Sequence, residues 1–344
     1  MKKSLLILLF TCWALFFAAF RPVMPFAAET AAFPDGTPVT GGRILMGTIG
    51  EPSNLIPYMA SDSASGEITG LLYVAPLKYD KDLNVVPWAA ASYEVLEGGR
   101  LLRFVLRDDI RWEDGVPLTA DDVEFTYKLM IDPKTPTAYS GDFLAIESFK
   151  KTGRLSFEVR YAKPFARSLM TWMGAILPKH VLEGQDIMTT PVARKPIGAG
   201  PYRLAKWDAG SMLTLTASDT YFEGRPNLDE VVYRIIPDPS TMFLELKAGK
   251  LDMMSLSPQQ YLRQTQGPQW ERDWRKYRYL SFSYTFLGFN LEHPFFKDVR
   301  VRRAISMAID RQSLIDGVLL GQGVPTVGPY KPGTWAYNDK LTPV

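Results

Sequence analysis

The sequence predicts an α/β protein with more than one domain. Strand-helix-strand alternation is the first sign: an apolar run at residues 231–236 precedes helical spacing at 240–248, and residues 251–254 resume an extended pattern. A separate block, residues 77–184, mixes helices with strands of period two and is α+β in pattern. The chain has 344 residues, of which 46% are hydrophobic, so it is long enough to bury two or more domains.

The first 28 residues have the pattern of an export signal. Lys2 and Lys3 give a positive start, and an uncharged run follows from Leu5 to Phe20. A membrane-spanning helix needs about 20 apolar residues, so the pattern favours a signal peptide cleaved near residue 28 over a retained anchor. Cys12 lies inside the apolar run and is preceded by Phe and Thr, which favours an ordinary signal-sequence cysteine over a membrane-anchored lipoprotein.

Composition excludes several classes of function. Residues 1–28 hold the only cysteine and three of the 39 basic residues, so the mature chain would have no thiol and 36 basic against 37 acidic residues. A near-neutral chain is not the pattern of a nucleic-acid-binding protein, which normally shows a basic excess. The two histidines, His180 and His293, do not stand at a metal-binding spacing, and no Gly-rich phosphate loop is present. No metal or cofactor is therefore expected.

The folded part is expected to begin after a flexible leader at residues 29–41, which mixes Ala, Pro, Thr and Gly without periodicity. Residues 43–49 then predict a strand. A loop rich in turn residues follows, and residues 65–73 predict a helix.

The α+β block predicts half-buried strands at residues 101–107 and 155–161, where apolar and polar residues alternate. The second of these should be antiparallel, with one face in water. Between them, Thr119 and Asp122 predict the capped start of a helix.

The α/β pattern returns at residue 196. A Gly/Pro turn at residues 198–201 leads into predicted strands at 202–207 and 213–217. Ser240 is predicted to cap the helix that follows the buried run, and Gly249 to end it.

The stretch 284–311 organises the rest of the chain. An aromatic and β-branched run ends at Asn290, a Pro-containing turn follows, and Asp298 precedes apolar residues at helical spacing. This pattern predicts a strand that leads into a helix from Asp298 to Gly317.

Three blocks in this order, residues 91–123, 198–202 and 284–311, resemble bacterial extracellular solute-binding proteins of family 5. These are the oligopeptide-, dipeptide- and nickel-binding periplasmic proteins of ABC importers. The resemblance implies a periplasmic-binding-protein-like α/β fold of class II, in which two lobes close over a ligand and the first lobe carries the extra domain typical of peptide-binding members.

The same resemblance implies domain boundaries. Residues 42–75 and 196–285 would form lobe I, residues 76–195 the additional α+β domain, and residues 286–344 the hinge crossing with the start of an incomplete lobe II. Family members continue beyond this endpoint, so the chain is expected to be truncated or partial. No position matches the acidic residue of the second lobe that binds a peptide's α-amino group.

Site residues also follow from the resemblance. The residues expected to bind substrate are Ser61, Asp62, Ser63, Tyr284, Thr285, Phe286 and Tyr330. The alternative for the first three is a solvated loop that caps a helix, and the alternative for Tyr284 and Phe286 is a core role. Asn290 and Asp298 are expected to have hinge or structural roles.

The function implied by the resemblance is non-enzymatic. A periplasmic receptor, working as a monomer without nucleic acid, would capture a di- or oligopeptide non-covalently and deliver it to an ABC permease in the inner membrane. Nickel complexes, sugars or another small solute stay open as ligands, because ligand choice varies widely on one scaffold.

Two other classes remain as alternatives. An exported hydrolase would need a working carboxylate pair, and the candidates Glu113-Asp114 and Asp121-Asp122 stand at turn and helix-cap positions. A truncated remnant would fold its first lobe and bind nothing.

Overall fold

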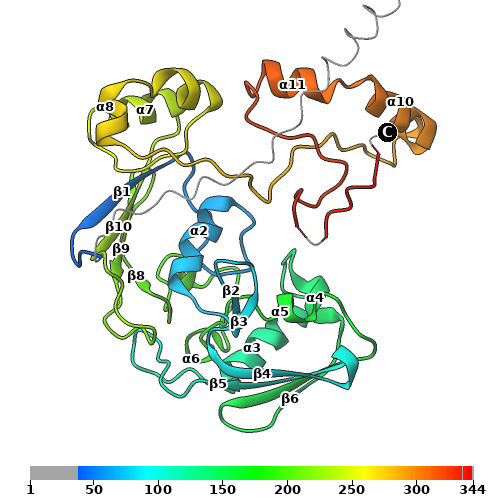
Figure 1. Cartoon of the computed structure of the whole chain (residues 1–344). Coiled ribbons are helices and arrows are strands. Elements are labelled where there is room, and N and C mark those ends of the chain that lie inside the picture. The colour runs from blue at the N-terminus through cyan, green and yellow to red at the C-terminus, as the bar shows by residue number, and fades with distance from the viewer. Residues whose placement is uncertain (1–37, 335, 343–344) are drawn as a thin grey trace, which may run out of the picture. The chain divides into compact units, whose positions relative to one another are not determined.

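The computed structural model describes residues 38–334 and 336–342, and Figure 1 shows its ribbon. Two compact units are present: an N-terminal unit that ends at Ser255 and a C-terminal unit that begins at Leu256. That boundary lies inside the stretch 196–285 assigned to lobe I from the sequence. The predicted signal peptide and residues 29–37 of the predicted leader lie outside the described residues. Within the described ranges, no helix is long and apolar enough to cross a bilayer.

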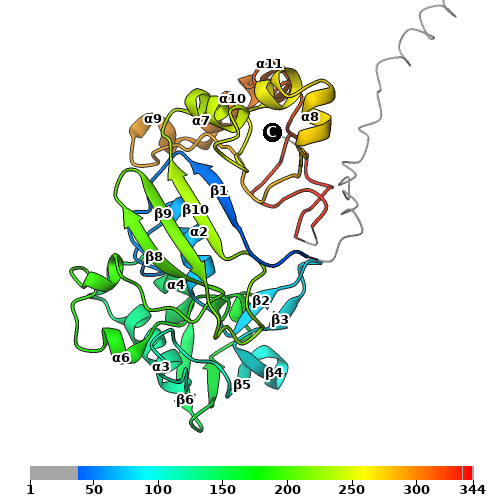
Figure 2. The ribbon, with the colours of Figure 1, turned by 90° about the vertical axis from the view of Figure 1, so that its left-hand side faces the viewer.

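A mixed four-stranded sheet forms one part of the N-terminal unit (Figure 2). Its strands, in spatial order, are β1 (Arg43–Thr48), β10 (Glu230–Ile235), β9 (Met212–Ala217) and β8 (Tyr202–Asp208). β1 pairs with β10 in parallel, and the other two pairs are antiparallel, so β1, β10 and β8 all end at the same edge. Helix α2 (Ser63–Leu72) covers one face (Figures 1 and 2). These elements confirm the predicted strands and the predicted first helix.

An antiparallel sheet forms the other part of this unit. Its order is β4 (Ala90–Leu96), β5 (Leu101–Leu106), β7 (Ser156–Tyr161) and β6 (Ile146–Lys151). Helix α3 (Ala120–Ile131) begins with the predicted capping box, because the Thr119 hydroxyl accepts from the helix backbone and the Asp122 carboxylate accepts from the Thr119 N–H at 2.8 Å. Both predicted strands of this block are confirmed.

The remaining elements of the N-terminal unit are short. They are β2 (Leu77–Tyr79), β3 (Val85–Pro87), η2 (Glu97–Gly99), α4 (Ser140–Leu144), α5 (Ser168–Thr171), α6 (Lys179–Leu182), η3 (Pro191–Ala193) and α7 (Pro239–Lys247).

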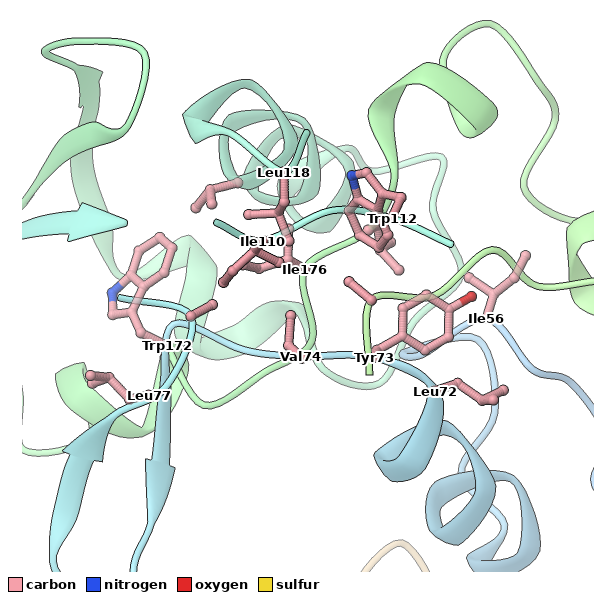
Figure 3. Packing of buried hydrophobic residues seen from close by; sticks show 14 of the residues in the cluster. Ile56, Leu72, Tyr73, Val74, Leu77, Ile110, Trp112, Leu118, Trp172 and Ile176 are labelled. Carbon is pink, nitrogen blue, oxygen red and sulfur yellow. The ribbon is translucent and has the colours of Figure 1, made fainter. Parts of the chain in front are cut away.

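One buried hydrophobic cluster joins the two sheets. Leu213 and Val231 of the mixed sheet belong to the same cluster as Phe104 and Phe157 of the antiparallel sheet. Figure 3 shows part of this cluster, in which Tyr73 and Val74, the residues that follow α2, lie beneath Trp112. The two sheets are therefore parts of a single packed body.

Two glycines allow the end of α2 to approach the turn before β8. A Cβ added to Gly198 would lie 2.0 Å from the carbonyl oxygen of Leu72, and one added to Gly200 would lie 2.4 Å from that of Leu71. The Gly200 N–H donates to the Leu72 carbonyl at 2.8 Å. The Gly/Pro turn thus serves as a close backbone contact as well as a chain reversal.

The C-terminal unit contains only short helices among its described residues. They are the π-helical turn η4 (Gln260–Gln264), α8 (Pro268–Asp273), α9 (Pro294–Lys297), α10 (Val299–Ala308) and α11 (Arg311–Gly317). The predicted strand that ends at Asn290 is wrong: residues 275–289 are irregular, and no backbone hydrogen bond pairs them with another described segment. A strand needs such a ladder to satisfy its backbone groups.

The predicted single helix from Asp298 to Gly317 is also wrong. Asp298 does cap α10, because its carboxylate accepts from the Arg300 N–H at 2.8 Å. A second cap then interrupts the run, since Asp310 accepts from the Ser313 N–H at 3.0 Å and starts α11. An aspartate that bonds the backbone ahead of it favours a new helix start over continuation.

Two smaller predictions need correction in the N-terminal unit. The cap of α7 is Asp238, which accepts from the Thr241 N–H at 2.7 Å ahead of Pro239, and not Ser240. Residues 251–254 contribute only one bridge, from Met253 to Met46, instead of a strand.

Candidate functional site

The loop between β1 and α2 lines a cavity of about 350 Å³. This loop leaves the sheet at the edge where β1, β10 and β8 end, and in open α/β sheets ligands bind outside the carboxyl ends of the strands. The other walls come from α2, the segment after it and three further loops. The lining residues are Asn54, Ile56, Pro57, Tyr58, Ala60, Ser65, Gly66, Thr69, Gly70, Tyr73, Val74, Ala75, Trp88, Tyr139, Met173, Gly174 and Ala175.

Tyr58 is the most constrained residue of this cavity. Its φ of 73° lies in the left-handed region, which a bulky side chain rarely adopts. Its hydroxyl donates to the Ala175 carbonyl at 2.8 Å, and its carbonyl accepts from the Thr137 hydroxyl at 2.8 Å. A Cβ on Gly174 would lie 2.2 Å from the Tyr58 hydroxyl oxygen, so a larger residue there would force the Tyr58 side chain to move. Backbone strain that is held by several contacts is typical of ligand sites.

Asp62 ties this loop to the start of α2. As the N-cap it accepts from the Ser65 N–H at 2.7 Å, and it also accepts from the hydroxyls of Ser53 at 2.6 Å and Ser65 at 2.8 Å. Burial alone would raise the pKa of the Asp62 carboxyl, but these hydrogen bonds outweigh it and hold the pKa below its ordinary value. The loop and the helix are therefore fixed together at neutral pH.

Asp62→Ala is expected to lower the free energy of unfolding at pH 7 by about 1 kcal/mol, because the helix loses its N-cap. A carboxyl whose folded pKa is depressed stabilises the fold above its unfolded pKa, and this stabilisation is lost as the pH falls through the folded pKa. The gap between wild type and variant should therefore begin to narrow below about pH 4 and continue to narrow as the pH falls further. Urea unfolding at several pH values measures it, with Ser63→Ala as the control. A gap that does not change with pH would contradict the capping role.

A second group lies at the same edge of the mixed sheet. The Trp207 indole N–H donates to Glu51 Oε1 at 2.6 Å, and the Arg194 guanidinium lies 3.9 Å from the centroid of the Trp207 ring. Arg194 also approaches Glu51 Oε1 to 3.7 Å. Sequence reasoning missed this group, because its members come from three distant segments.

The two carboxylate pairs weighed for a hydrolase have partners within the fold. In the first pair, Glu113 accepts a hydrogen bond from the Gly198 N–H at 3.2 Å, and Asp114 contacts His180 at 2.7 Å. In the second pair, Asp121 forms an ion pair with Lys151. Asp122 accepts hydrogen bonds from the N–H groups of Thr119 and Lys179 at 2.8 and 3.0 Å. Burial raises the pKa of Glu113 and of Asp122. In the part of the chain that the structure describes, no cluster of three or more His, Cys, Asp or Glu side chains could hold a metal ion.

The predicted site residues are divided between the two units. Ser61, Asp62 and Ser63 lie in the N-terminal unit, between Ala60 and Ser65, which line the cavity. The three themselves do not line it, and Asp62 acts there as the helix cap.

The other predicted site residues lie in the C-terminal unit. Tyr284 and Phe286 are exposed, with ring centroids 5.4 Å apart, and they share the irregular segment with Thr285. Tyr330 is exposed on a loop whose next residue, Lys331, lies over Phe282. Asn290 accepts from the Glu292 N–H at 3.0 Å and forms a local turn. Ligand contact by these residues stays a prediction.

Sequence reasoning also missed the cavity itself. Tyr58, Trp88 and Tyr139 are aromatic residues from separate loops, and nothing in their spacing brings them together. One signal was available: Gly66 and Gly70 stand four residues apart in a predicted helix, which leaves one helix face without side chains.

Residues 84–344 match the family described as bacterial extracellular solute-binding proteins, family 5 Middle. The oligopeptide-binding protein AppA of Bacillus subtilis is 32% identical over 312 residues, which cover 89% of this chain and 57% of that protein. The structure of Bacillus subtilis AppA in complex with a nonapeptide has a TM-score of 0.81 at 31% identity and covers 89% of this chain and 61% of that one. NikZ from Campylobacter jejuni in complex with Ni(L-His) has a TM-score of 0.74 at 26% identity over 83% of this chain and 57% of that one. The chain thus spans little more than half the length of the curated relative.

Proposed function

Because this chain belongs to the bacterial extracellular solute-binding proteins of family 5, we propose that it captures peptides non-covalently. Its α/β fold is that of periplasmic binding proteins over the part that the relatives cover. The observation that carries the proposal is the likeness, at a TM-score of 0.81, to an oligopeptide-binding protein that holds a nonapeptide.

The structure supports this proposal in two ways. Extended peptides are bound through their backbone, with pockets beside them for side chains. The cavity lined by the loop between β1 and α2, called the Tyr58 cavity from here on, has a volume of about 350 Å³. This volume is within the usual range for ligand sites. The backbone groups of residues 275–289 form no backbone hydrogen bonds with another described segment. They are therefore available for hydrogen bonds to the backbone of an extended peptide.

Thermal unfolding tests the proposal. A ligand that binds only the native state stabilises it by about 2.7 kcal/mol at a hundredfold excess over its Kd. A library of di- to nonapeptides is therefore expected to raise the unfolding midpoint of the full chain, whereas the same concentration of free amino acids should not. A cooperative transition that no peptide moves would contradict peptide capture.

A nickel complex is the second candidate ligand. NikZ, which is solved with Ni(L-His), has the same fold at 26% identity. The same unfolding measurement with Ni²⁺ and L-histidine separates the two candidates. An unfolding midpoint that rises with this mixture, and that none of the peptides raises, would favour the nickel complex.

The proposal extends to the whole protein. The segment 1–28 directs export and is cleaved, the mature chain works as a monomer in the periplasm, and an ABC permease of the inner membrane receives the ligand. No chemical step occurs on the ligand, and no nucleic acid takes part. Residues 42–75 and 196–285 serve as lobe I, residues 76–195 as its additional domain, and residues 286–344 as the hinge and the beginning of lobe II.

A further inference from the structure

Two glycines of α2 give the Tyr58 cavity part of its space. Gly66 and Gly70 are four residues apart, so they lie on one face of the helix, and both line the cavity. A Cβ added at either position would meet no heavy atom within 4 Å. Glycine weakens a helix relative to alanine, and here, unlike at Gly198 and Gly200, no described neighbour requires it. The pair keeps a face of α2 open instead of packing it.

The lining of the cavity is mostly apolar and aromatic. None of the described residues that line it is charged. The Trp88 indole N–H donates to the hydroxyl of Tyr221 at 2.9 Å, and Tyr221 does not line the cavity. The indole therefore adds no unsatisfied hydrogen-bond donor to the cavity wall. A carboxylate placed against such a wall would lose hydration without gaining a partner. An ammonium would gain only contact with the aromatic faces, and Trp88 already has Lys78 Nζ at 5.3 Å from its ring centroid.

Tyr73 is a lining residue whose hydroxyl is buried from solvent. The hydroxyl of Tyr73 is buried and has no hydrogen-bond partner among the described residues. In Figure 3 it points toward Ile56, which lines the same cavity. Because this oxygen is buried, it adds no polar group to the surface that a ligand would meet.

From these observations we propose that the Tyr58 cavity is a side-chain pocket that selects a large, uncharged and preferably aromatic side chain of the captured peptide. The proposal rests on peptide capture and adds its specificity. Aromatic rings pack favourably against the edges and faces of other aromatic rings, which Tyr58, Trp88 and Tyr139 supply. The open face of α2 gives the ring room to enter.

A peptide series tests the pocket. The parent is a nine-residue peptide of Ala and Ser, and Phe, Lys or Glu is placed in turn at each position. Burial of a Phe side chain is expected to tighten binding by about 10- to 100-fold at one position or more. Lys or Glu at the same position should bind no more tightly than the parent, as measured by titration calorimetry with the full chain.

Gly70→Leu fills the pocket and is the decisive variant. It replaces a poor helix former with a good one, so the unfolding midpoint should not fall. The variant should lose the preference for Phe over the parent peptide, because the ring no longer has space. Both peptides are measured on the same variant, so a uniform change in affinity does not alter this comparison. Gly141→Leu is the matched control: Gly141 is also helical and has no atom near its Cβ, but it does not line the cavity.

Each outcome is distinct. Loss of the Phe preference in Gly70→Leu and its retention in Gly141→Leu support the pocket. A preference that survives in Gly70→Leu would overturn it, as would equal binding of the Phe, Lys and Glu peptides, and in both cases peptide capture would stand. If no peptide binds to wild type, peptide capture itself fails and the pocket fails with it.

Discussion

Gly200→Ala is expected to lower the free energy of unfolding by about 3 kcal/mol, the upper part of the usual range for overpacking. The new Cβ would lie 2.4 Å from the carbonyl oxygen of Leu71 and 2.6 Å from the carbonyl carbon of Leu72. Both are backbone atoms at the end of α2, so relief requires that the helix and the turn before β8 move apart. That movement would also break the 2.8 Å hydrogen bond from the Gly200 N–H to the Leu72 carbonyl. Urea unfolding followed by circular dichroism measures the loss.

Gly141→Ala is the control for this effect. Gly141 lies in α4, where an added Cβ meets no atom within 4 Å, so alanine should leave the fold unchanged or slightly more stable. If Gly200→Ala unfolds at the same urea concentration as Gly141→Ala, the close contact between α2 and the turn does not exist as described.

Trp172→Ala is expected to cost about 3 to 5 kcal/mol of stability, as large-to-small changes of buried aromatic residues do. The Trp172 ring is buried among aromatic rings of the antiparallel sheet, with its centroid 5.3 Å from that of Phe157, 5.6 Å from Phe104 and 6.0 Å from Phe149. Alanine would remove all of these contacts and leave a cavity in the cluster that joins the two sheets. The loss should appear as a lower urea midpoint.

Trp172→Phe separates packing from ring chemistry. A phenylalanine keeps most of the aromatic contact and should recover more than half of the stability that alanine loses. A Trp172→Ala variant as stable as wild type would show that this ring is not central to the core.

Much of the fold could be predicted because local patterns and tertiary packing agree. The alternation at residues 155–161 and the Thr119–Asp122 capping box specify structure within a few residues, and both are confirmed. The failures lie where the sequence permits a regular element and the described surroundings do not support it. The aromatic run before Asn290 has the composition of a strand but no partner segment, and Asp310 divides a helical pattern by capping a second helix.

The candidate site was less predictable, since it depends on contacts between distant segments. The positive φ of Tyr58 is held by Thr137, Gly174 and Ala175, which lie about 80 residues or more further along the chain. No periodicity encodes such a conformation. Asp62 was predicted to bind substrate, with a helix-capping loop as the alternative, and the cap that it forms is a local feature. The pairing of Glu51 with Trp207 joins two strand ends and left no mark in the sequence.

Amide hydrogen exchange of the full chain, with and without a saturating nonapeptide of the Phe series, is the most direct test of peptide capture at the Tyr58 cavity. Backbone groups that become buried or ordered by a ligand exchange more slowly. We expect slower exchange in residues 50–66, 137–139 and 173–175, which form the cavity and its supports. Bound peptide with unchanged exchange in all three segments would contradict the account.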